Sequence, residues 1–132
     1  MKLRGHFGLL LALVSCSLGI FAQTKQDHAF DPFRAEKNLE IGEFYLKKGN
    51  YDAAIERFKE SIRYKPKFAR PHRLLAEAYE KKGDAAEAVK YYRMYLEILP
   101  AAQDAGKVRK RIEKLSRTLE REAKRSPSLK SR

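Results

Sequence analysis

An offset of 34 residues relates two neighbouring stretches of this chain to each other. Four pairs of identical residues keep it: Tyr45 and Tyr79, Gly49 and Gly83, Ala54 and Ala88, and Pro66 and Pro100. Conservative pairs keep it as well, among them Ile41 with Leu75, Gly42 with Ala76, and Phe58 with Tyr92. Self-similarity at one period of a few tens of residues is typical of repeat architectures. The sequence therefore predicts two tandem units, 35–68 and 69–102.

Each unit has the apolar spacing of two helices. In the first unit, Leu39, Gly42 and Leu46 recur at helical intervals, and so do Ile55 and Phe58 further along. The pattern returns in the second unit at the same offset. We therefore expect each unit to be a helical hairpin.

Glycine and proline mark the expected helix ends. Gly49 and Gly83 are expected to end the first helices, because glycine adopts the left-handed conformation without steric cost. Pro66 and Pro100 are expected to end the second helices, since proline disfavours helical geometry in the residue before it. Asp52 is then placed early in a second helix, near the positive end of its dipole.

Small and aromatic residues suggest how the helices pack. We expect Gly42 to face Ala54 where the two helices of one unit cross, as Ala76 faces Ala88, because a larger side chain would push the axes apart. The aromatic residues are expected to fill the volume between neighbouring units: Tyr45, Phe58, Tyr79 and Tyr92.

These positions resemble the tetratricopeptide repeat motif. The residues that carry the resemblance are Gly42, Tyr45, Gly49, Ala54, Phe58 and Pro66 in the first unit, and Ala76, Tyr79, Gly83, Ala88, Tyr92 and Pro100 in the second. The chain departs from the motif at Asn38 and His72, where tryptophan is common. The resemblance implies an all-α fold, a short α-solenoid of two helix-turn-helix units.

Residues 103–125 are predicted to form a fifth helix. Val108, Ile112, Leu115 and Leu119 recur there at helical spacing, and most residues between them are charged. Stacked arrays need a terminal element with a polar outer face. We interpret this segment as a capping helix over the second unit.

Two short segments flank this array. Residues 23–34 are predicted to be a flexible lead-in, from which Phe30 and Phe33 are expected to pack onto the first helix. Residues 126–132 contain Pro, Ser and base without core residues, and are predicted to be a disordered basic tail.

Residues 1–22 have the pattern of a secretory signal peptide. A short basic start with Lys2 and Arg4 precedes an uncharged run from Phe7 to Ala22, which is shorter than a comfortable bilayer span. An uncleaved anchor is the alternative. Two processing sites stay open: cleavage after Ala22, and lipidation of Cys16, because the residues leading to this cysteine resemble a bacterial lipobox. The expected location is periplasmic or secreted, with a lipid-anchored form at the inner or outer membrane as the alternative.

The net charge of +12 is unevenly distributed. Residues 35–102 carry 14 Lys or Arg against 11 Asp or Glu, whereas residues 103–132 carry 11 against 4. The basic character therefore belongs mainly to the C-terminal end, where binding of a polyanion or an anionic membrane surface is an alternative function. With a secretory signal ahead of it, nucleic acid is not the expected partner.

The chain shows no arrangement of residues for catalysis. Its histidines, His6, His28 and His72, lie far apart in the sequence, and its one cysteine cannot complete a metal site with them. There is also no glycine-rich phosphate loop. We expect neither an enzyme nor a bound cofactor or metal.

The resemblance implies that the first helices line a concave groove that holds a partner peptide or helix. The implied groove positions are Glu36, Leu39, Glu43, Leu46, Lys47, Arg70, Arg73, Glu77, Glu80 and Lys81, joined by Asp104, Lys107, Arg111 and Lys114 on the fifth helix. Leu39 and Glu43 depart from the Lys and Asn pair by which some members clamp a carboxylate. The expected function is a non-catalytic adaptor of the bacterial cell envelope that binds another protein, and self-association stays open because two repeats are near the minimum for a stable array.

Overall fold

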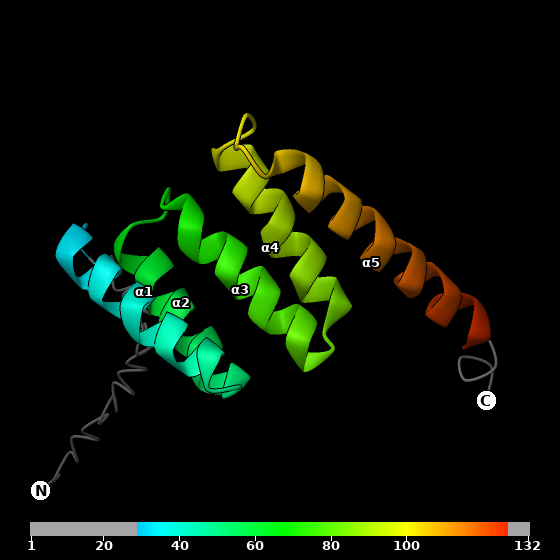
Figure 1. Ribbon diagram of the computed structural model, residues 1–132, viewed down its shortest axis with the longest axis horizontal. Coiled ribbons are helices and arrows are strands. Elements are labelled where there is room, and N and C mark those ends of the chain that lie inside the picture. The colour runs from blue at the N-terminus through cyan, green and yellow to red at the C-terminus, as the bar shows by residue number, and fades with distance from the viewer. Residues whose placement is uncertain (1–28, 127–132) are drawn as a thin grey trace, which may run out of the picture.

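The computed structural model describes residues 29–126, and every regular element in that range is an α-helix. The helices are α1 (Pro32–Lys47), α2 (Tyr51–Tyr64), α3 (Ala69–Lys82), α4 (Ala85–Ile98) and α5 (Ala105–Arg125). α1 pairs with α2 and α3 with α4, while contacts of α2 with α3 and of α4 with α5 join the pairs into one array. Figure 1 shows α1 at one end of this array and α5 at the other. The predicted fold, a short helical solenoid, is confirmed.

The turns inside the two hairpins are built alike. Gly49 and Gly83 both adopt positive φ angles, +73° and +91°, as expected for residues that end a helix. The next residue caps the following helix: Asn50 Oδ1 accepts from Ala53 N at 3.2 Å, and Asp84 Oδ1 accepts from Glu87 N at 3.1 Å. Asp52 lies in the first turn of α2, as expected, but the cap itself is Asn50.

The start of α1 corrects two predictions. The helix begins at Pro32, so residues 32–34 of the predicted lead-in are helical, because Asp31 caps them by accepting from Arg34 N at 2.9 Å. Asp31 N–H also donates to Tyr64 O at the end of α2. Phe33 was expected to pack onto the first helix; it is part of that helix, and 81% of its surface is exposed. Phe30 is exposed as well.

Aromatic residues pack between the two helices of each hairpin. A Cβ atom on Gly42 would lie 2.5 Å from the ring of Phe58, so this buried aromatic residue fills the crossing of α1 and α2. Tyr79 stacks on Tyr91 of its own hairpin, with ring centroids 5.7 Å apart. Phe58 and Tyr79 therefore both make contacts inside their own helix pairs, and Tyr79 also faces the first unit, because Lys59 Nζ of α2 lies 6.0 Å from its ring centroid.

One buried hydrogen bond ties the first hairpin together. Ser61 Oγ donates to Ala35 O at 2.7 Å, from α2 to α1, and both residues are fully buried. A small hydroxyl residue fits here because the two backbones approach closely.

The apolar side of α5 covers the end of the second hairpin. Val108 is buried, and Ile112 and Leu115 are partly buried against the core. Leu119 is also partly buried, whereas the remaining residues of the last two turns are mostly exposed. No helix within residues 29–126 is long and apolar enough to span a membrane. The predicted signal peptide at 1–22, the lipidation site at Cys16 and all but the first residue of the tail at 126–132 lie outside the described residues.

Candidate functional site

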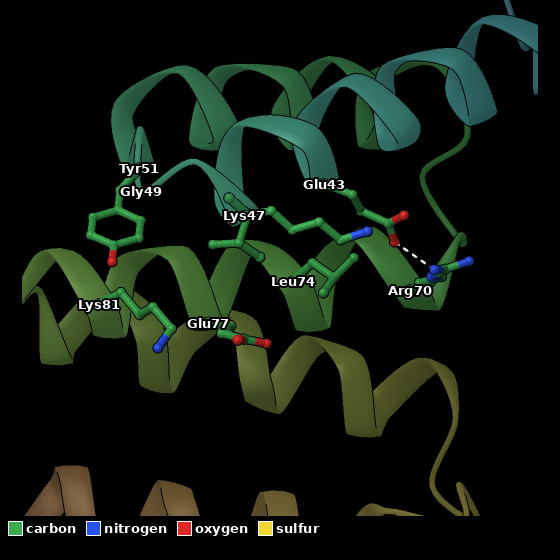
Figure 2. Close-up of a pocket in the computed structure, with 9 residues that line it drawn as sticks. Glu43, Lys47, Gly49, Tyr51, Arg70, Leu74, Glu77 and Lys81 are labelled. Atoms are coloured by element: carbon green, nitrogen blue, oxygen red, sulfur yellow. Dashed lines mark ion pairs between the residues drawn. The ribbon is translucent and has the colours of Figure 1, made fainter.

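A cleft of about 530 Å³ lies between the first helices of the two hairpins. Figure 2 shows Glu43 and Lys47 on α1 facing Arg70 and Leu74 on α3. The residues that line the cleft are Glu43, Leu46, Lys47, Gly49, Tyr51, Arg70, Leu74, Glu77 and Lys81. On α3 these residues follow the spacing 70, 74, 77 and 81, which places them on one face of the helix.

The cleft combines an apolar wall with a charged rim. Leu74 is buried and Leu46 is half-buried, so together they form the apolar part of the lining. Arg70 crosses from α3 to Glu43 on α1 with an N–O distance of 2.6 Å (Figure 2). This pair closes one end of the cleft.

A second, smaller cleft of about 270 Å³ lies on the neighbouring face of α3, against α5. Its lining residues are Arg73, Tyr92, Asp104, Lys107, Val108 and Arg111. Arg73 lies between two carboxylates, 3.7 Å from Asp104 and 4.0 Å from Glu77. Because Glu77 lines the first cleft, this ion pair connects the two clefts.

The inner wall of the second cleft is a hydrogen-bonded network. Tyr92 donates its hydroxyl hydrogen to Glu80 at 2.9 Å, and Arg111 forms an ion pair with the same carboxylate at 3.3 Å. Burial raises the pKa of Tyr92 to about 12, with the hydrogen bond to Glu80 acting in the same direction and Arg111 opposing it. Tyr92 is therefore a neutral hydrogen-bond donor at physiological pH and not an acid–base group.

The acidic and basic residues of the two clefts differ in their pairing. Each carboxylate of the lining and of the network behind it has a basic partner: Glu43 with Arg70, Glu77 and Asp104 with Arg73, and Glu80 with Arg111. Lys47, Lys81 and Lys107 are exposed and have no ion-pair partner among residues 29–126. The clefts therefore present three ammonium groups and no unpaired carboxylate.

The structure distributes the residues assigned to the groove among the two clefts, the exposed surface outside them, and the core. The first cleft contains Glu43, Leu46, Lys47, Arg70, Glu77 and Lys81, and the second contains Arg73, Asp104, Lys107 and Arg111, with Glu80 behind it. Lys114 is exposed on α5 away from both clefts, and Glu36 is exposed on α1 outside them.

Leu39 is a correction to the predicted groove. Only 5% of its surface is exposed, and it belongs to the hydrophobic core. It lies on the same side of α1 as Gly42 and Ala35, which are buried too. It is therefore a packing residue of α1 and cannot offer its side chain to a partner.

Five residues of the two clefts are not among the predicted groove positions: Gly49, Tyr51, Leu74, Tyr92 and Val108. Leu74 could have been found, because it lies four residues after Arg70 and three before Glu77 on one helical face. Tyr51 could not, because it reaches the cleft from the start of α2 and no periodicity of the first helices includes it.

The described part of the chain offers no metal site. Residues 29–126 contain no group of three or more His, Cys, Asp or Glu side chains placed to hold a metal ion. His72 is buried, and its Nε2 lies 2.9 Å from Pro66 O. Because a carbonyl can only accept, Nε2 carries the hydrogen in this contact, and Nδ1 has no hydrogen-bond partner in the described part of the chain.

Comparison with known proteins agrees with the presence of tetratricopeptide repeats. A family model described as tetratricopeptide repeat matches residues 39–105, half of the chain. A probable UDP-N-acetylglucosamine–peptide N-acetylglucosaminyltransferase of Arabidopsis thaliana is 37% identical over 62 residues, which are 47% of this chain. The match spans only 6% of the length of that much longer protein, so it reflects a repeat segment. The chain belongs to the tetratricopeptide repeat family, whose repeats generally mediate protein–protein interaction and are typically non-catalytic.

Proposed function

We propose that this protein is a non-catalytic adaptor that binds an acidic segment of a partner protein across the two clefts of its first helices. The observation that carries the proposal is the set of ammonium groups of Lys47, Lys81 and Lys107, one each from α1, α3 and α5, which have no ion-pair partner within residues 29–126. Each would find a counter-ion in a partner that bears Asp or Glu residues.

The surrounding contacts support a partner with both acidic and apolar side chains. The carboxylates near the lysines are already neutralised by Arg70, Arg73 and Arg111, so they do not compete for the ammonium groups. Leu46 and Leu74 give an apolar residue of the partner a surface to bury. Charge complementarity of this kind contributes mainly to specificity and to the rate of association.

A binding assay with matched charge reversals tests the proposal. Fluorescently labelled peptides, each with two or three Asp or Glu residues around a leucine, are titrated with the protein and compared with peptides carrying Lys instead. Lys47→Glu combined with Lys81→Glu should weaken binding of the acidic peptides at least about tenfold. Lys67→Glu, an equal charge change per site on an exposed lysine of the α2–α3 turn, is the control and should have little effect.

Either of two results would contradict the proposal. If the acidic and basic peptides bind equally, or if Lys67→Glu weakens binding as much as the double substitution of Lys47 and Lys81 does, the clefts are not the site. Substitution of Arg70 or Arg73 is less informative, because each also holds two helices together.

We further propose that the protein acts in the cell envelope, after export directed by residues 1–22. The support is the basic start and apolar run of this segment. The intact mass of the mature protein distinguishes cleavage after Ala22 from lipidation at Cys16. Recovery of the unprocessed chain in the soluble cytoplasmic fraction would refute export.

The exposed bases of α5 favour a second candidate, an anionic surface such as a lipid membrane. Exposed basic residues occur along the whole helix, including Lys110, Lys114, Arg121 and Lys124, none of which has an ion-pair partner in the described range. Sedimentation with vesicles that contain anionic lipid should then fall steeply with added salt. Arg121→Glu with Lys124→Glu should abolish it while leaving peptide binding intact.

A further inference from the structure

The outer face of α1 presents a stripe of apolar and basic residues, all exposed except Ile41, which is half-buried. It consists of Phe33, Lys37, Ile41, Phe44 and Lys48, which follow one another at intervals of three or four residues. The first four therefore lie along one side of α1, and Lys48 is the C-cap directly after it. Phe33 is 81% exposed and Phe44 56% exposed. We call these five residues the α1 stripe. Figure 1 shows that α1 is the end of the array, with no other helix on its outer side.

The repeat offset reveals what such a face does in the second unit. The residues of α3 at the positions of Lys37, Ile41 and Phe44 are Pro71, Leu75 and Ala78, and all three are buried. Gly42 faces α2, so its equivalent Ala76 faces α4, and the other side of α3 packs against the first unit. The α1 stripe is therefore a unit-docking face that has no unit against it in the described chain.

The opposite end of the array is closed. On α5, the positions equivalent to Ala76 and Tyr79, which face α4 within the second hairpin, are Lys110 and Glu113, and both are exposed. A charged outer face of this kind terminates a stack. Two copies of the chain therefore cannot stack end to end, because an apolar α1 face would meet a charged α5 face.

We propose that the α1 stripe is the interface of a twofold homodimer, in which α1 packs antiparallel against α1 of a second copy. With one apolar end and one charged end, the copies can only pair through their α1 ends, which gives a closed, isologous contact. Each copy then covers the exposed rings of the other.

The stripe is complementary to itself when it runs antiparallel. In the register with its twofold axis beside Ile41, Phe44 lies opposite Lys37 of the second copy, and Phe33 lies opposite Lys48 of the second copy. The two Ile41 side chains meet at the axis. A lysine over an aromatic ring is a favourable pair, and Lys48 Nζ already lies 5.8 Å from the ring centroid of Phe44 in the same chain.

Sedimentation velocity over a concentration series tests the proposal. It uses the purified full chain and, in parallel, the form that begins at Gln23. Both should show a monomer–dimer equilibrium, and Phe44→Glu should raise the dissociation constant at least about tenfold. Because Phe44 is exposed in the single chain, helix content by circular dichroism should stay unchanged. Met94→Glu, at an exposed apolar residue of α4, is the matched control and should keep the dimer.

A cross-link tests the register. Ile41→Cys in a Cys16→Ser background should form a disulfide-linked dimer under mild oxidation, whereas Ala86→Cys, at an exposed position on α4, should not. A chain that stays monomeric throughout, or a dimer that survives Phe44→Glu, overturns the proposal. So does a monomeric full chain whose melting temperature falls with Phe44→Glu, since residues 1–28 would then cover the stripe instead of a second copy.

Discussion

Gly42 is the position where one methyl group tests the packing of the first hairpin most directly. In Gly42→Ala the new Cβ atom would lie 2.5 Å from Phe58 Cε1 and 2.7 Å from Cδ1. Carbon atoms in contact are ordinarily about 3.5–4.0 Å apart. Phe58 is fully buried, so its ring cannot move into solvent, and α1 and α2 would have to separate.

The expected change combines two opposing effects. Forcing a methyl group into a packed core costs about 1–3 kcal/mol, and the fully enclosed ring places this site in the upper half of that range. Replacing glycine by alanine inside a helix returns about 1 kcal/mol. The free energy of unfolding should therefore fall by about 1–2 kcal/mol, which lowers the melting temperature by about 4–16 °C in a domain of this size.

Urea unfolding followed by circular dichroism at 222 nm measures this difference. Gly106→Ala is the matched control, because Gly106 also lies in a helix but a Cβ atom there meets nothing within 4 Å. This control should leave the stability unchanged or raise it by up to about 1 kcal/mol. The two substitutions, identical in chemistry, should thus shift the unfolding midpoint in opposite directions or at least by clearly different amounts.

A double substitution identifies the cause. Phe58→Leu removes the atoms closest to the new methyl group, so the loss from Gly42→Ala should shrink by about 1 kcal/mol in its presence. If Gly42→Ala is as stable as the unchanged protein, or if the two substitutions are additive, close packing of Phe58 is not what keeps residue 42 small.

Three further substitutions test buried polar groups. Burial lowers the pKa of His72 below 6.5, so on acidification the unfolded state binds a proton at a higher pH than the folded state does. The contribution of His72 to the free energy of unfolding should therefore be fully present above pH 6.5 and be lost as the pH falls through the lowered pKa. Replacing His72 with Leu should reduce this acid loss in urea titrations, and an equal loss would contradict the assignment. Tyr92→Phe removes the donor to Glu80 and should cost about 1–2 kcal/mol, while spectrophotometric titration of the unchanged protein should show one phenol ionising near its pKa of about 12; a cost near zero would refute the network. Ser61→Ala should cost about 1 kcal/mol and Ser116→Ala on α5 almost nothing, so equal values would argue against the buried hydrogen bond.

The local elements of the fold could be predicted because local residues determine them. The positive φ angles of Gly49 and Gly83 and the ends of α2 and α4 before Pro66 and Pro100 follow from preferences of single residues and their neighbours. The first helix was placed too late because its start depends on Asp31, which the repeat offset does not include.

Contacts within the core were less accessible to prediction. Helical spacing placed Leu39 on the apolar side of the first helix. Its assignment to the groove came from its position in the family motif, whereas the structure shows it buried in the core. Phe58 could be recognised as a core residue, yet its neighbour Gly42 is identified only when α1 and α2 are placed together. Periodicity gives the side of a helix on which a residue lies, whereas the neighbour on that side depends on how the helices cross.

The sequence by itself determined the two helical hairpins and the basic end of the chain, because these follow from a repeat offset, from residue preferences and from charge counting. Only the tertiary structure decided which charges are available to a partner. Glu43 and Arg70 lie on different helices, as do Arg73 and Asp104, and their pairing leaves Lys47 and Lys81 unpaired in the described range. An ion pair needs two groups within about 4 Å, and that distance is set by the packing of helices from separate parts of the chain.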